Sequence, residues 1–183
     1  RARREGLRDF GACMSPMNAF QILQGIETLS LRMPRHVANA QAVAGFLAEQ
    51  PQVKGVGYPG LAAHPDYELA KNLLPKGSGA VFSFELDADR ATGRKFVESL
   101  KLFSHLANVG DARSLVIHPA STTHFRMDDA ALAQAGIGQG TLRLSIGLED
   151  PADLIDDLKA AFRRAFPKPR KSATPGQSGK ENS

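Results

Sequence analysis

The sequence predicts an α/β domain in which a mixed sheet is covered by helices. Segments with apolar residues at helical spacing alternate with short segments of strand character, and the connections between them do not suit hairpins. The chain has 183 residues, 42% of them apolar and 23% charged, which is enough for one hydrophobic core of ordinary size. With 17 Gly, 11 Pro and one Cys, the composition excludes collagen-like, disulfide-framework and wholly disordered classes.

Two helices are predicted before residue 50. Ser15 is a predicted N-cap, and Pro16 occupies the first helical position, where its missing N–H costs nothing. A long amphipathic helix is predicted over residues 29–49 and ends before Pro51. Because proline disrupts a helix interior, this helix either begins at Pro34 or is kinked there.

The middle of the chain predicts a strand, a helix and a second strand. The first strand covers residues 53–58, and a polar helix follows over residues 66–74. Residues 80–86, AVFSFEL, are the clearest strand, since small or polar residues alternate there with Phe82, Phe84 and Leu86. One face of this strand is therefore expected to be buried.

The last third predicts a helix over residues 90–100, strands over 114–118 and 141–147, and a final helix. Asp150 is the predicted N-cap of that helix, with Pro151 at its first position. The acidic residues between 149 and 157 are interpreted as this cap and a solvated helix face.

The net charge of +4 lies at the two ends of the chain. Residues 1–9 hold four basic and two acidic residues, and residues 167–183 hold four basic and one acidic residue. The remainder has 15 basic and 16 acidic residues, so the predicted domain is neutral and nucleic acid is not an expected partner. Residues 167–183 are rich in Pro, Ser, Gly and Lys and are predicted to be a disordered basic tail.

Location is suggested by cysteine use and by hydropathy. The single Cys13 fits a reducing, cytoplasmic setting. No run of about 18 apolar residues occurs, so no membrane partner is expected.

The sequence contains none of the common catalytic motifs considered below. The glycines near residues 77–79 and 136–140 do not open a helix after a strand, as a phosphate-binding loop requires. No G-x-S-x-G elbow occurs, and the five histidines lack the clustered Cys or acidic residues of a metal site. The sequence therefore predicts no catalytic residue and no metal in this chain.

Arg143 stands out because it interrupts the apolar strand TLRLSIGLE. A charge there is costly unless it meets a partner or a cleft, and the planar guanidinium suits two-pronged binding of a carboxylate. Spacing alone favours the alternative, an arginine on the solvent face of a half-buried strand. Asn108 lies in a predicted loop, where Asn and Gly are turn formers by default.

Four stretches of the sequence carry a family resemblance: GACMSPMNAFQILQGIETLSLRMPRHVANAQAVAGFL (11–47), YPGLAAHPDYELA (58–70), LFSHLANVGDARSLVIHPASTTH (102–124) and LRLSIGLEDPADLIDDL (142–158). Together they resemble the C-terminal part of the Cys/Met-metabolism pyridoxal-phosphate enzymes. The similarity runs from about residue 3 to 165, and the ANVGD segment resembles the O-acetylhomoserine sulfhydrylase branch.

The resemblance implies a fold-type I transferase, usually a homotetramer. Residues 1–12 would end a truncated large cofactor domain, and residues 13–166 would form the C-terminal substrate-binding domain. Arg143 would hold the substrate α-carboxylate, with Asn108 as a neighbouring contact. The Schiff-base lysine and the other residues that hold pyridoxal 5'-phosphate would lie upstream of Arg1, so this chain alone is predicted to be inactive.

The implied reaction converts O-acetyl-L-homoserine and sulfide to L-homocysteine and acetate. Cystathionine γ-synthase and methionine γ-lyase, of the same family, are alternatives. A stand-alone, non-catalytic α/β interaction module is a further alternative from another class.

Overall fold

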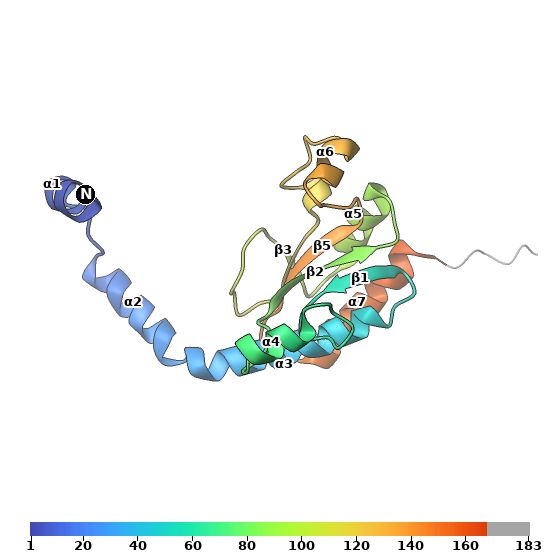
Figure 1. Cartoon of the computed structure of the whole chain (residues 1–183), viewed down its shortest axis with the longest axis horizontal. Coiled ribbons are helices and arrows are strands. Elements are labelled where there is room, and N and C mark those ends of the chain that lie inside the picture. The colour runs from blue at the N-terminus through green and yellow to red at the C-terminus, as the bar shows by residue number, and fades with distance from the viewer. Residues whose placement is uncertain (168–183) are drawn as a thin grey trace, which may run out of the picture.

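A five-stranded mixed sheet forms the centre of the molecule, with strand order β1-β2-β5-β4-β3 (Figure 1). The computed structural model describes residues 1–167. Neighbouring strands are antiparallel except β3 and β4, which are parallel. The strands are β1 (Val53–Gly57), β2 (Val81–Leu86), β3 (Ser104–His105), β4 (Leu115–Ile117) and β5 (Thr141–Ser145). The predicted mixed α/β sheet is therefore confirmed.

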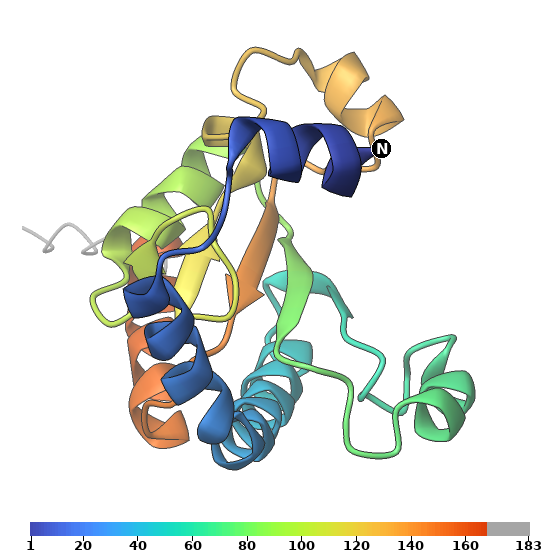
Figure 2. The same ribbon diagram turned by 90° about the vertical axis from the view of Figure 1, so that its left-hand side faces the viewer.

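Three helices pack on one face of this sheet and enclose the core (Figures 1 and 2). They are α3 (Leu29–Ala48), α5 (Arg90–Ser99) and α7 (Pro151–Ala165). Phe96 of α5 stacks edge-on against Phe162 of α7, with ring centroids 4.8 Å apart. Burial of these aromatic side chains supplies much of the apolar area that stabilises the domain.

The alternation predicted for β2 is confirmed by burial. Phe82, Phe84 and Leu86 are buried against the helices, whereas Val81 and Ser83 are exposed. β5 follows the same rule, since Leu142 and Leu144 belong to the core. A strand turns successive side chains to opposite faces, so the residues between these leucines lie on the face away from α3, α5 and α7.

The long helix α3 begins at Leu29, so the start at Pro34 is wrong. Pro34 lies inside the helix, where it removes one hydrogen bond to the carbonyl of Ser30. Ser30 is exposed, so water can satisfy that carbonyl. His36 is the first buried residue of α3, and the proline turn therefore lies outside the core.

The N-terminal segments stand away from the sheet (Figure 1). They are η1 (Ala2–Leu7), α1 (Arg8–Phe10) and α2 (Pro16–Glu27), and none of them has a buried residue. The predicted cap of α2 is confirmed, because the Ser15 hydroxyl accepts a hydrogen bond from the Asn18 N–H at 3.2 Å. The predicted division at residues 12 and 13 stays a prediction.

Smaller elements complete the described chain. They are α4 (Tyr67–Leu73), η2 (Pro119–Ser121) and α6 (Asp129–Gln134). β3, η2 and α6 were not expected from the sequence, because each is too short to show a clear period. The predicted tail lies outside the described residues, apart from Pro167. No helix within residues 1–167 is both long enough and apolar enough to cross a membrane.

Candidate carboxylate-binding site

Arg143 lies in the middle of β5, which is the central strand of the sheet. It is paired with Ser83 of β2 on one side and with Ile117 of β4 on the other. Because Leu142 and Leu144 point to the helices, Arg143 projects from the opposite face, where it is half-buried.

The Arg143 guanidinium has no acidic partner within residues 1–167. No side-chain hydrogen bond and none of the seven ion pairs of the described chain includes it. A half-buried cation without a partner is costly, and a carboxylate that binds with both oxygens would remove that cost. The arrangement favours an anion-binding arginine over one that is merely solvated.

Asn108 lies in the loop of residues 106–113, which we call the Asn108 loop. Its Oδ1 accepts a hydrogen bond from the Val109 N–H at 2.9 Å, so the amide N–H donors remain for another group. The Gly110 N–H donates to the Ser145 hydroxyl at 3.2 Å. Ser145 is two residues beyond Arg143 on β5 and lies on the same face. The Asn108 loop is thus held against the face that carries Arg143.

Sequence reasoning missed three polar residues around this face. Ser83 is the cross-strand neighbour of Arg143, and Ser145 holds Gly110. The interpretation of Glu149 as part of a solvated face is wrong, because its carboxylate accepts hydrogen bonds from Ser114. Asp150 alone caps α7, so the helix start does not require the neighbouring Glu149. A second acidic residue next to the cap could therefore have been predicted to have another partner.

Residues 1–167 do not by themselves fit pyridoxal phosphate. All six lysines within residues 1–167 are exposed. Three of them form surface ion pairs, for example Lys54 with Asp87 at 3.2 Å and Lys71 with Glu68 at 3.3 Å. An exposed, ion-paired ammonium lacks the desolvation that activates a Schiff-base lysine. We therefore derive no chemical step through the cofactor from these residues.

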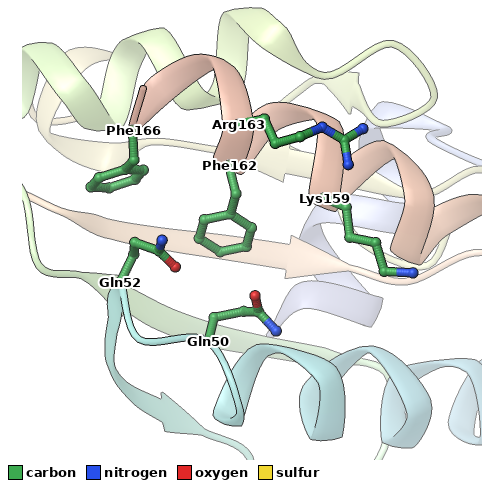
Figure 3. A pocket seen from close by; sticks show the side chains of 6 residues that line it. All are labelled: Gln50, Gln52, Lys159, Phe162, Arg163 and Phe166. Atoms are coloured by element: carbon green, nitrogen blue, oxygen red, sulfur yellow. The ribbon is translucent and has the colours of Figure 1, made fainter. Parts of the chain in front are cut away.

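A cavity of about 450 Å³ lies on the other side of the sheet, between α7 and the end of α3 (Figure 3). Phe162 and Phe166 give it an apolar wall, and Gln50 and Gln52 lie opposite (Figure 3). Its Lys159 ammonium is paired with Asp156 at 2.9 Å. Because Phe162 packs against the helix-covered face, this cavity is separate from Arg143.

His118 is fully buried and has a structural environment. Its Nδ1 lies 2.8 Å from the Ser121 hydroxyl, and its Nε2 lies 2.7 Å from the Gln139 carbonyl oxygen. Burial lowers the pKa of His118 and keeps the ring neutral, so Nε2 donates and Nδ1 accepts. No group of three or more metal-binding side chains occurs among residues 1–167.

The fold is an α/β domain whose central strand carries Arg143 on the face away from the helices. The model of the Cys/Met metabolism PLP-dependent enzyme family matches residues 2–163. The chain belongs to this family.

Relatives cover nearly the whole described chain. The chain is 48% identical over 164 residues to O-acetyl-L-homoserine sulfhydrylase of Leptospira meyeri, covering 89% of this chain and 37% of that protein. It is 47% identical to L-methionine gamma-lyase of Pseudomonas putida, covering 89% of this chain and 41% of that protein. The chain thus spans about two fifths of the length of these relatives.

A solved structure shows the same fold. It is a putative O-acetylhomoserine (thiol)-lyase from Campylobacter jejuni that carries a pyridoxyl-lysine monophosphate. The TM-score is 0.80 at 44% identity, over 89% of this chain and 39% of that one. The expected fold class, a domain of a PLP-dependent transferase, is confirmed.

Proposed function

We propose that this chain is the substrate-carboxylate-binding part of a longer enzyme that makes L-homocysteine and acetate from O-acetyl-L-homoserine and sulfide. The observation that carries the proposal is the half-buried Arg143 guanidinium without an acidic partner in residues 1–167. The name and 48% identity of the Leptospira meyeri sulfhydrylase support the choice of substrate.

In this proposal Arg143 donates two N–H groups to the two oxygens of the α-carboxylate. The amide of Asn108 donates a further hydrogen bond from the loop above the same face. Together these contacts orient the amino acid, and they leave the electron-withdrawing chemistry to the cofactor and to residues outside this chain.

The exposed apolar side chains of α2 support a longer polypeptide. Met17, Phe20 and Leu23 are each about 60% exposed, and α2 has no buried residue. Surfaces of this kind are covered in functional assemblies. We propose that other parts of the longer chain and of its homotetramer cover α2.

A cytoplasmic location and the absence of nucleic-acid and membrane partners belong to the same proposal. They are supported by the single Cys13 and by the near balance of charge between residues 10 and 166.

The test replaces Arg143 in the longer enzyme. We expect Arg143→Ala to raise KM for O-acetyl-L-homoserine and to lower kcat/KM by about 30- to 1,000-fold, because a charge-assisted pair worth about 2–4 kcal/mol is lost. Arg143→Lys should recover part of this, and the cofactor absorbance should be unchanged. The matched control is Arg94→Ala, which breaks an exposed ion pair with Glu98. Wild-type kinetics in Arg143→Ala would refute the role of Arg143.

A second candidate reaction is favoured by one observation, the 47% identity to the Pseudomonas putida L-methionine gamma-lyase. Product analysis separates the candidates. Homocysteine from sulfide supports a sulfhydrylase, cystathionine from cysteine supports the synthase, and elimination from methionine supports the lyase. No observation favours the stand-alone interaction module.

A further inference from the structure

A set of hydrogen bonds fastens the Asn108 loop to the end of β5. Besides the bond from Gly110 to Ser145, the Leu148 N–H donates to the Ala112 carbonyl at 2.8 Å. The contacts therefore join the downstream half of the loop to the segment that follows Arg143.

Glu149 is at the centre of this connection. Its Oε1 accepts from the Ser114 N–H at 2.6 Å, and its Oε2 accepts from the Ser114 hydroxyl at 2.8 Å. The same hydroxyl oxygen accepts from the Gly147 N–H at 2.8 Å. Ser114 is fully buried, and bonds from a buried donor to a carboxylate are strong. We call these three residues the Ser114–Glu149 clamp.

Gly147 allows the two segments to approach this closely. A Cβ at Gly147 would collide with the Ala112 carbonyl oxygen and with the Glu149 carboxylate. From the other side, Asn39 of α3 donates from Nδ2 to the carbonyl oxygens of Gly147 (3.0 Å) and Glu149 (2.7 Å). The segment that follows β5 is thereby bonded to α3 on one side and, through Ser114, to the residue that follows the Asn108 loop on the other.

We propose that Glu149 is a positioning residue for carboxylate recognition. It acts through Ser114 and holds the Asn108 loop in place, so that the amide of Asn108 and the guanidinium of Arg143 meet one carboxylate. Glu149 itself does not touch the substrate. The inference rests on the proposed function, because it assigns Glu149 to the same site.

The experiment uses the longer enzyme with O-acetyl-L-homoserine as varied substrate. We expect Glu149→Ala to raise KM at least about fivefold, with kcat within about threefold and the cofactor absorbance unchanged. Glu149→Gln should recover most of the loss, because its amide can still accept from the Ser114 N–H. Glu98→Ala, at an exposed acidic residue, is the matched control and should leave KM unchanged.

A double-mutant cycle separates positioning from a general structural role. If Glu149 acts through the Asn108 loop, Glu149→Ala should add less than about twofold to KM in an Asn108→Ala background. The proposal would be overturned if the increase in KM of the double variant equalled the product of the increases in the two single variants. An unchanged KM in Glu149→Ala would also overturn it.

If Glu149→Ala does not fold, Ser114→Ala tests the same clamp from the other partner. It should raise KM in the same way, and an unchanged KM would overturn the proposal. A wild-type enzyme without sulfhydrylase activity, or an Arg143→Ala variant with wild-type kinetics, would instead defeat the proposed function. If Arg143→Ala impairs the kinetics but neither Glu149→Ala nor Ser114→Ala changes KM, only the inference about Glu149 is overturned.

Discussion

The Gly110 N–H donates to the Ser145 hydroxyl at 3.2 Å, across 35 positions of sequence. This bond holds Gly110 of the Asn108 loop against Ser145, which lies on the face of β5 from which Arg143 projects. The loop that contains Asn108 and the strand that contains Arg143 are thereby joined, although they come from different parts of the chain.

The chain of 183 residues should not form a specific internal aldimine with pyridoxal phosphate. Its six described lysines are exposed, so only weak and unsaturable adducts are expected. Absorbance titration followed by borohydride reduction and peptide mapping checks this. A saturable band of one cofactor per chain, trapped on one lysine, would contradict it.

The isolated chain should self-associate through its N-terminal helices. The side chains responsible are the exposed apolar residues of α2. Light scattering over a range of concentrations measures the effect, and replacing Phe20 and Leu23 with Ser should reduce it. If the chain is a monomer at every concentration, the exposed apolar side chains of α2 do not drive self-association.

Stability should fall at acidic pH because of His118. Burial lowers the pKa of His118 in the folded state, whereas the unfolded chain protonates near the ordinary value of about 6.5. The stabilisation is complete above that value and is lost as the pH falls below it toward the folded-state pKa, by at most about 1.4 kcal/mol per pH unit. Urea unfolding at pH 7.5 and 5.5 measures the loss.

The matched variant is His118→Gln, which should lose less stability between the two pH values than the wild type. Other titrating groups contribute equally to both proteins and cancel in the comparison. Equal losses in the two proteins would mean that His118 does not control the acid sensitivity.

Truncation of Leu144 should destabilise the domain strongly. Its side chain is fully buried where β5 meets the helices, so Leu144→Ala should cost about 2–5 kcal/mol of unfolding free energy. Leu73→Ala, at a residue that is 69% exposed, is the control and should cost far less. Chemical denaturation gives both values, and similar losses would refute the assignment of the core.

Much of the fold was predictable because its signals are local. The alternation in residues 81–86 and the Ser15 and Asp150 caps each act within a few residues. Pro34 left the start of the long helix open between two alternatives, and the structure shows that a proline is tolerated in the helix turn that lies outside the core.

By itself, the sequence determined the α/β class, four of the five strands of the sheet and the choice of Arg143 as a candidate. Only the tertiary structure decided that Arg143 is half-buried without an acidic partner in residues 1–167, and that Glu149 clamps the Asn108 loop. The physical reason is range. Caps and periodicity depend on neighbours in sequence, whereas the pairing of Ser83 with Arg143 and the bond of Ser114 to Glu149 join residues 60 and 35 positions apart.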